Sequence, residues 1–301
     1  MSVTPADYET IRTQYAEFDL PTSSSSLNLI EITAAELSVT SLKEAISEAA
    51  ETTESDLIVL RTTDDQNTIT YAAQSDELTI SIDATQFGSV TIVSLGTQNL
   101  TLDAAQLSRV MTVSGSATTL NLGGLTLTGG KSYGSYPDSY GGGIYNDGGT
   151  LTVTNSTITG NSASADSSHG RACGGGIYNL SGTLTITNST IMGNSASSQG
   201  GAPASCGGGI YNYSGTLTVT NSTIAGNSAS AYGSYPDSYG GGIYNSSGML
   251  TVTNSTIAGN SASAYGSYPA SYGGGIYNSS DTLTVTNSTI AGNSASSGGG
   301  I

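Results

Sequence analysis

The stretch GGGIYNSSGMLTVTNSTIAGN, from Gly240 to Asn260, recurs with few changes along the second half of this 301-residue chain. Its triple glycine returns in steps of 33 residues and then once more after 25. Self-similarity at a fixed period of this size indicates one structural unit stacked on copies of itself. The copies of the triple glycine begin at Gly141, Gly174, Gly207, Gly240, Gly273 and Gly298.

Each unit carries the signature of short strands. The letters TLTVTN alternate threonine with leucine or valine, as a strand with one buried face does, and Asn-Ser and Gly-Asn pairs mark the corners. The pattern predicts three strands per unit, GIYN, TLTVTN and STITGN. The inward positions of the first unit are Ile144, Leu151, Val153 and Ile158. The outward positions are Tyr145, Thr150, Thr152, Thr154 and Thr157.

A unit of this kind cannot bury its apolar face alone. It is rich in Gly, Thr and Asn and offers no run of good helix formers at a period of 3.6 residues. When units stack at about 4.8 Å, each strand can pair with its copies above and below. The sequence therefore predicts an all-β fold, a single-stranded right-handed parallel β-helix or β-solenoid, with about one coil per repeat.

Asparagines recur at the corners of the predicted coil. Copies that lie over one another can form a hydrogen-bonded ladder, which needs no ligand. We expect the same of Asn155 and Asn161 with their copies. The main predicted ladder consists of Asn146, Asn179, Asn212, Asn245 and Asn278.

The segment between GNSAS and the next triple glycine varies, and it is rich in tyrosine in three copies. Solenoids place such insertions on one face as loops, which often bind partners. Tyrosine offers a broad amphipathic contact area at a small entropic cost. The alternative is that these tyrosines only pack loop against loop. The candidate contact residues are Tyr133, Tyr136, Tyr232, Tyr235, Tyr265 and Tyr268, and a separate column, Tyr145, Tyr178, Tyr211, Tyr244 and Tyr277, is expected to stack and stiffen one strand face.

The first third of the chain is less regular. DYETIRTQYAEF predicts a short helix, and SLKEAISEAAE predicts an amphipathic helix over residues 41–50 that caps the solenoid, with Ser41 and Glu44 as a capping box. We divide the chain into a helical cap segment (1–56), irregular coils (57–130) and regular repeats (131–301), continuous as one domain. Because the last letters, GGGI, begin another repeat, we expect a longer native polypeptide or end-to-end self-association through the open coil.

The charge of the chain excludes one class of partner. The net charge is −16, of which −13 falls within residues 1–128 and −3 in the remainder. Nucleic-acid binding depends on Lys and Arg, so we expect no such partner. No apolar run approaches 18 residues, so we expect no membrane span.

The repeats resemble those of right-handed parallel β-helix surface proteins of the polymorphic outer membrane protein type, whose GGA(I/V/L) and FxxN motifs correspond to GGGI and IAGN. SLKEAI is similar to the Ser-Leu-Arg-Glu-Ala motif of secreted bacterial β-helix proteins, although Lys43 replaces the Arg and Thr40 stands where that motif has Cys. The resemblance covers residues 28–301. It implies an exported, extracellular or cell-surface protein with a structural or adhesive role. A glycan or a cell-surface protein is the candidate partner, and no residue identifies which.

Cys173 and Cys206 lie 33 residues apart, so they occupy the same position in neighbouring coils. Their separation should be close to the strand spacing of about 4.8 Å, which a disulfide accepts. An extracellular setting favours the bridge. The alternative is a reduced, stacked pair, because parallel side-chain vectors strain a disulfide.

Two other functions fit the same fold. A pectate-lyase-like enzyme acting on polysaccharides needs clustered carboxylates and a base, whereas the regular coils offer one mixed cluster, Asp166, His169 and Arg171. We therefore expect no catalytic activity, no metal and no cofactor. The outward Thr-x-Thr rows match the pattern of flat ice-binding solenoids, but Thr is also a common surface residue of strands, and Met249 interrupts one column.

Overall fold

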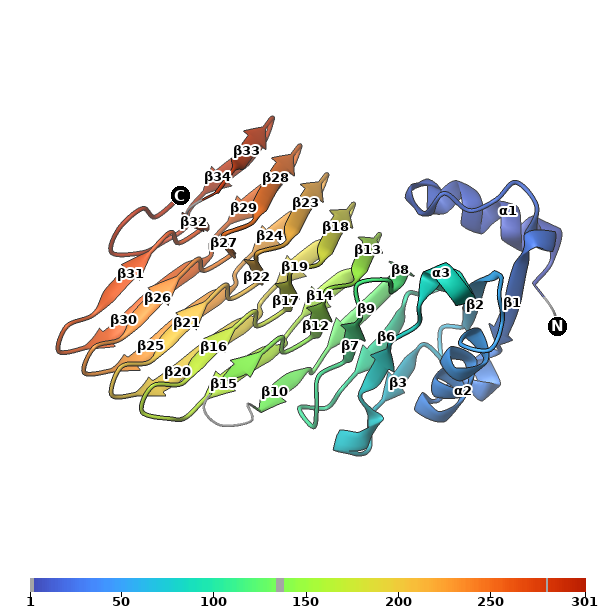
Figure 1. Cartoon of the computed structure of the whole chain (residues 1–301), viewed down its shortest axis with the longest axis horizontal. Coiled ribbons are helices and arrows are strands. Elements are labelled where there is room, and N and C mark those ends of the chain that lie inside the picture. Colours follow the sequence, from blue (N-terminus) through green and yellow to red (C-terminus); the bar gives the residue numbers. More distant parts are fainter. Residues whose placement is uncertain (1–2, 134–137, 280) are drawn as a thin grey trace.

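The computed structural model describes residues 3–133, 138–279 and 281–301, and these form a parallel β-solenoid (Figure 1). The strands stack along the long axis of the molecule in sequence order, so the colours run from blue at one end to red at the other (Figure 1). Every strand pair within the described residues is parallel, as expected for stacked copies of one repeated unit. The predicted fold class, a parallel β-solenoid, is confirmed.

Three sheets form the body of the solenoid. In spatial order, sheet I contains β1 (Leu27–Ile32), β2 (Ser55–Thr62), β5 (Val90–Gly96), β8 (Thr119–Gly123), β13 (Thr150–Thr154), β18 (Thr183–Thr187), β23 (Thr216–Thr220), β28 (Met249–Thr253) and β33 (Leu283–Thr286). Sheet II contains β3 (Thr68–Thr70), β6 (Leu100–Asp103), β9 (Leu125–Thr128), β14 (Thr157–Thr159), β19 (Thr190–Met192), β24 (Thr223–Ala225), β29 (Thr256–Ala258) and β34 (Thr289–Ala291). Sheet III contains β4 (Leu78–Ile80), β7 (Met111–Ser114), β12 (Ile144–Asp147), β17 (Ile177–Leu180), β22 (Ile210–Tyr213), β27 (Ile243–Ser246) and β32 (Ile276–Ser279).

Two further sheets lie beside the body. Sheet IV contains β10 (Lys131–Tyr133), β15 (Ser162–Ala165), β20 (Ser195–Gly200), β25 (Ser228–Gly233) and β30 (Ser261–Gly266). Sheet V contains β11 (Ser139–Tyr140), β16 (Arg171–Cys173), β21 (Ala204–Cys206), β26 (Asp237–Tyr239) and β31 (Ala270–Tyr272). A complete regular coil therefore has five strands, and the prediction of three was wrong. The variable segment forms paired strands because its copies also stack in register.

The register of the regular coils follows the 33-residue period. Leu151 pairs with Leu184, and Leu184 pairs with Leu217. The four predicted inward residues of the first unit are fully buried, and their copies continue one apolar core through the body. This confirms the predicted inward face of the strands.

The predicted outward face needs two corrections. Tyr178 and Tyr211, copies of Tyr145, are buried because sheet V packs over the outer side of sheet III. Thr154 is also buried. Its neighbour in the preceding coil is Gly123, whose backbone lies under the Tyr15 ring, so the N-terminal segment covers this corner.

The capping helix α2 spans Val39–Ala49, and its N-cap is Ser38 rather than the predicted Ser41. The Ser38 hydroxyl oxygen accepts a hydrogen bond from the Ser41 backbone N–H at 3.1 Å, so the helix begins one turn earlier. Its apolar side, which includes Leu42 and Ile46, packs on the core of the first coils. The other helices that the structure describes are α1 (Pro5–Gln14), α3 (Ala84–Phe87) and four 3₁₀ turns, Ala16–Phe18, Ser24–Ser26, Ala34–Glu36 and Gln74–Asp76.

Helix α1 covers the outer face of sheet I rather than its end. Leu57 and Val59 of β2 point outward and pack against Ile11 and Tyr15. Both faces of β2 are therefore buried, with Ile58 and Leu60 in the main core. Among the described helices, none is long and apolar enough to cross a membrane.

Candidate functional site: a tyrosine-edged fin

Sheets IV and V together form a thin projection, which we call the fin. In each regular coil the chain leaves the body after sheet II, runs outward in sheet IV, turns, and returns in sheet V. The two sheets face each other through small side chains, because Ala163, Ala172 and Ala196 are buried between them. The hydroxyl of Ser205 donates to the backbone oxygen of Ser230 at 2.7 Å and ties one sheet to the other. The alanine and serine of the SAS segments therefore allow the two sheets to lie close together.

The triple glycine forms the turn from the fin back into the body. Gly207 adopts a positive φ of 59°, which favours glycine. At Gly208 there is no room for a side chain, since a Cβ would lie 2.3–2.5 Å from backbone atoms of Ser228 and Gly241. The repeated glycines thus permit fin and body to meet within every coil.

The far edge of the fin carries exposed tyrosines. The rings of Tyr232 and Tyr265 stack at a centroid distance of 5.0 Å, and those of Tyr235 and Tyr268 stack at the same distance. Despite this stacking, the four residues remain 47–68% exposed. Stacking supports the predicted packing of loop on loop, and exposure leaves hydroxyls and ring edges free for contact. We call these four residues the tyrosine edge.

The positions of several candidate contact residues differ from the prediction. Tyr232 and Tyr265 lie in strands β25 and β30, so they are not loop residues as predicted. Tyr133 ends β10, and Tyr136 lies outside the described residues. In the coil before Tyr232 the corresponding position is Gln199. Its amide donates to Asp166 at 3.0 Å, so the tip of that part of the fin is polar.

A second group of tyrosines fills the inner corner between sheet V and sheet III. The predicted column has neighbouring ring centroids 4.8–5.4 Å apart, in stacked, tilted and edge-to-face arrangements. Tyr140 and Tyr239 of sheet V join it at 4.8 and 5.5 Å. Burial raises the pKa of Tyr178 and Tyr211 above the ordinary value of a phenol.

Cys173 and Cys206 lie in this corner, directly beside each other on β16 and β21. Both are fully buried, and both are free thiols in this structure. Arg171 lies above them at the surface, with its Nη2 atom 3.8 Å from the sulfur of Cys206. The backbone N–H of Arg171 donates to Asp138 at 2.8 Å.

The two thiols differ in their surroundings. A hydrogen bond from Cys173 and the nearby Arg171 guanidinium lower the pKa of Cys206. Burial raises the pKa of Cys173, and its hydrogen bond to Cys206 raises it further. Cys206 is therefore the thiol of the pair that loses its proton more readily.

The asparagine columns form two hydrogen-bonded ladders. From Asn146 to Asn278, each side-chain amide donates to the next side-chain oxygen at 2.6–2.7 Å. A second ladder runs from Asn161 to Asn293 at 2.9–3.0 Å. The Asn155 column is not a ladder. Its members adopt positive φ angles of 48–50° at a corner, and the Asn155 amide donates to the backbone oxygen of Gln14.

The mixed cluster of Asp166, His169 and Arg171 is not brought together as a site. Asp166 accepts a hydrogen bond from Gln199, His169 contacts the hydroxyl of Ser168 at 3.1 Å, and Arg171 turns toward Cys206. Within the described ranges, no group of three or more His, Cys, Asp or Glu residues is placed to hold a metal ion.

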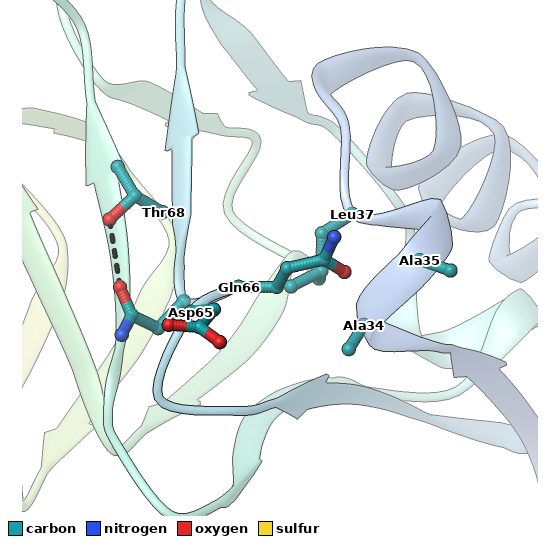
Figure 2. A pocket seen from close by; sticks show the side chains of 7 residues that line it. Ala34, Ala35, Leu37, Asp65, Gln66 and Thr68 are labelled. Carbon is teal, nitrogen blue, oxygen red and sulfur yellow. Dashed lines mark hydrogen bonds between the residues drawn. The ribbon is translucent and has the colours of Figure 1, made fainter.

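A small cleft opens at the N-terminal end, between the turn at Ala34 and the loop before β3 (Figure 2). It has a volume of about 230 Å³ and is lined by Ala34, Ala35, Leu37 and residues 65–68. Figure 2 shows the Gln66 side chain reaching across it toward Leu37. With one carboxylate, Asp65, in its lining and no base facing it there, the cleft offers no arrangement for acid–base chemistry.

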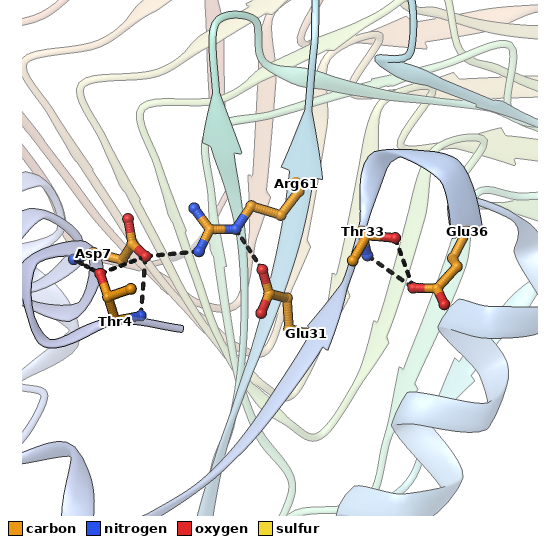
Figure 3. Close-up of polar contacts among 6 residues, drawn as sticks. All are labelled: Thr4, Asp7, Glu31, Thr33, Glu36 and Arg61. Atoms are coloured by element: carbon orange, nitrogen blue, oxygen red, sulfur yellow. Dashed lines mark hydrogen bonds and ion pairs between the residues drawn. The ribbon is translucent and has the colours of Figure 1, made fainter. Parts of the chain in front are cut away.

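Next to this region, Arg61 ties α1 to the solenoid (Figure 3). Its guanidinium donates to Asp7 of α1 at 2.7 Å and to Glu31 of β1 at 2.6 Å. Asp7 also accepts hydrogen bonds from the backbone and hydroxyl of Thr4. The bond from Arg61, followed by those from Thr4, holds the pKa of Asp7 well below its ordinary value of 3.8.

The Asp7–Arg61 tie predicts that α1 loosens in acid. A carboxyl whose folded pKa is depressed contributes stability above its unfolded pKa and loses it as the pH falls toward the folded value. We therefore expect the backbone amides of α1 to lose protection from hydrogen exchange only as the pH drops below about 4. Asp7→Asn should cause the same loss already at pH 7.

Glu36→Gln is the matched control for this prediction. Thr33 lowers the pKa of Glu36 in the same way, but Glu36 makes no tie to α1 (Figure 3). If Asp7→Asn leaves the exchange of α1 unchanged, or if Glu36→Gln loosens α1 equally, the ion pair does not hold the helix.

Compared with known protein families and with curated proteins, the chain matches no family model and no curated sequence.

Proposed function

We propose that this chain is a non-catalytic, extracellular or cell-surface β-solenoid that makes adhesive contacts through the tyrosine edge of its fin. The observation that carries the proposal is the exposure of two stacked tyrosine pairs, Tyr232 with Tyr265 and Tyr235 with Tyr268, at the rim of the fin. Tyr, Ser and Gly, the residues that dominate the tip, are also those that dominate antibody binding loops. The GGGI and IAGN repeats, which resemble polymorphic outer membrane protein repeats, support the same placement at a cell surface.

The chemistry of the edge favours an uncharged partner. The tip from Tyr265 to Pro269 contains no charged residue, and the tip from Tyr232 to Pro236 contains none either. Tyrosine can supply both apolar ring contact and a hydroxyl hydrogen bond at such a surface. A glycan or a neutral patch of a cell-surface protein therefore suits the tyrosine edge better than an anionic polymer does.

Ice binding is the second candidate, because the outward threonines of sheet I lie in register. Thr152 pairs with Thr185, Thr185 with Thr218, and the column continues through Thr251. Such columns repeat at about 4.8 Å along the axis. Met249 breaks the neighbouring column and is 52% exposed, which favours the tyrosine edge over this face.

A polysaccharide-active enzyme is the remaining alternative. Asp166, His169 and Arg171 each contact a different partner, so they do not form one catalytic cluster. The activity would therefore have to come from isolated acidic residues of the coils. Release of new reducing ends or unsaturated sugars from a panel of polysaccharides would support this alternative over the adhesive role.

Replacing Tyr232, Tyr235, Tyr265 and Tyr268 together by serine tests the proposal. Beads coated with the intact chain should adhere to cells, and the variant should reduce this adhesion at least about tenfold, because aromatic anchors dominate such contacts. The free energy of unfolding should change by less than about 2 kcal/mol, since two exposed stacked pairs are lost. Pretreatment of the cells with glycosidases or proteases separates a glycan partner from a protein partner.

The control changes the outward threonine column of sheet I, with Thr185, Thr218 and Thr251 replaced by serine. We expect this variant to adhere as the unmodified chain does. If the threonine variant loses adhesion and the tyrosine variant keeps it, the contact surface is the threonine face. Unchanged adhesion in both would refute a role for the tyrosine edge.

A further inference from the structure

The corner between sheet V and sheet III contains two thiols that are held together without being bonded. Strands β16 and β21 place Cys173 directly beside Cys206, and neighbouring strands lie about 4.8 Å apart, within the Cα range of a disulfide. In the other coils of the same sheet this position is tyrosine: Tyr140 pairs with Cys173, and Cys206 pairs with Tyr239. Among the described strands of sheet V, this position is therefore cysteine in two adjacent coils and tyrosine in the others.

The charged and titratable groups around the pair are unevenly distributed. Arg171, exposed above the corner, directs Nη2 toward the sulfur of Cys206 at 3.8 Å. Asp138 lies beneath it and accepts from the Arg171 backbone and from the Tyr140 hydroxyl. The phenols that face the thiols are those of Tyr140, Tyr178, Tyr211, Tyr239 and Tyr244. Among the described residues, Arg171 is the cation whose side chain contacts the pair, and its contact is with Cys206.

We propose that Cys206, Cys173 and Arg171 form a peroxide-reactive dithiol site, in which Cys206 is the attacking sulfur, Cys173 is the resolving thiol, and Arg171 is a positioning residue. The oxidant is a hydroperoxide, with hydrogen peroxide as the simplest member. Oxidation links two neighbouring coils and closes a loop of 33 residues.

The chemistry takes two steps. The Cys206 thiolate attacks one peroxide oxygen, so a sulfur–oxygen bond forms, the oxygen–oxygen bond breaks, and hydroxide leaves with the second oxygen. Cys173 then attacks the sulfur of the sulfenic acid, so the disulfide forms, and the departing oxygen takes up the Cys173 proton and leaves as water. The two thiols lose two electrons, and the peroxide gains them. A thiol reductant reverses the change by exchange.

The test uses the full chain, reduced and folded, with hydrogen peroxide as the probe. We expect two free thiols per chain to fall to none, with a mass loss of two hydrogens and no mixed products. The apparent Tm should rise by about 5 °C, because the crosslink constrains a long loop in the unfolded chain. Retention of both thiols under conditions that oxidise the urea-unfolded chain would refute the proposal.

Single variants test the assignment of roles. Cys173→Ser leaves Cys206, which should form a sulfenic acid that dimedone traps, at the rate seen in the unmodified chain. Cys206→Ser leaves Cys173, which should react at least about tenfold more slowly. Equal rates in the two variants, or a faster reaction of Cys173, would overturn the assignment.

The role of Arg171 is tested by the pH profile of the reaction. Arg171→Gln should move the midpoint of the rate profile to higher pH, and Arg171→Lys should restore most of the original midpoint, because a cation near Cys206 favours the thiolate. A merely structural role would change the amount of folded protein without moving the midpoint. An unmoved midpoint in Arg171→Gln would therefore remove Arg171 from the site.

Discussion

Replacing Gly208 by alanine is expected to destabilise the solenoid by more than about 3 kcal/mol. The added Cβ would lie 2.3 Å from the backbone carbon of Ser228 and 2.5 Å from the backbone oxygen of Gly241. These are backbone atoms of the fin and of the next coil, so no side-chain rotation can relieve the overlap. Chemical denaturation followed by circular dichroism measures the loss.

Gly226→Ala is the matched control. Gly226 has a positive φ of 61°, but a Cβ there would meet nothing within 4 Å. This change should cost only the backbone term, about 1 kcal/mol. If the two variants lose equal stability, close approach between fin and body is not the reason for the triple glycine.

Asn194→Ala is expected to cost about 4 kcal/mol, since it leaves several buried polar groups without partners. The Asn194 amide donates to the backbone oxygen of Ile158 at 2.9 Å and to the side chain of Asn227 at 3.0 Å. Its side-chain oxygen accepts from the backbone and the amide of Asn161. A thermal or urea unfolding series measures the cost.

Asn188→Ala serves as the comparison within the same coil. Asn188 is exposed and adopts a φ of 49° at the corner, outside either ladder. Its replacement should cost about 1 kcal/mol, the penalty of an alanine in the left-handed region. If Asn194→Ala and Asn188→Ala lose the same free energy of unfolding, the ladder does not stabilise the fold.

The 33-residue period was sufficient to predict stacking, register and the inward side chains. Leu151 and its copies alternate with polar residues in every unit, and the period alone places Leu184 beside Leu151. The ladder from Asn146 follows from the same argument, because identical residues in register must lie over one another. Local pattern and global stacking agree at these positions.

The fin was not predicted, because its strands are short and carry only small side chains. Ala163 and Ala172 give almost no hydrophobic periodicity, yet they are buried where sheet IV meets sheet V. The faithful repetition of SAS in successive units was the signal for a strand there. Tyr232 belongs to that strand, so its exposure at the rim depends on a sheet that the sequence pattern shows only weakly.

Three other features were not predicted from the local sequence pattern. Helix α1 lies on sheet I through Ile11 and Leu57, and the run LIVLR, which is apolar on both faces, indicated such a cover. Ser38, not Ser41, caps α2, because the extra turn lets the Ser41 hydroxyl reach the backbone oxygen of Glu36. Arg171 meets Cys206 of the following coil only through the return of the fin.

Deleting one coil at a time tests most directly whether the stacked repeat builds the shape and the tyrosine edge makes the contact. Removal of residues 240–272 joins Tyr239 to Gly273 and takes away Tyr265 and Tyr268, whereas removal of residues 174–206 keeps all four tyrosines of the edge. Both chains should fold, since each coil contacts only its neighbours. We predict that the first deletion weakens cell adhesion at least about tenfold and that the second leaves it unchanged. Equal adhesion by the two shortened, folded chains would contradict the assignment of function to the tyrosine edge.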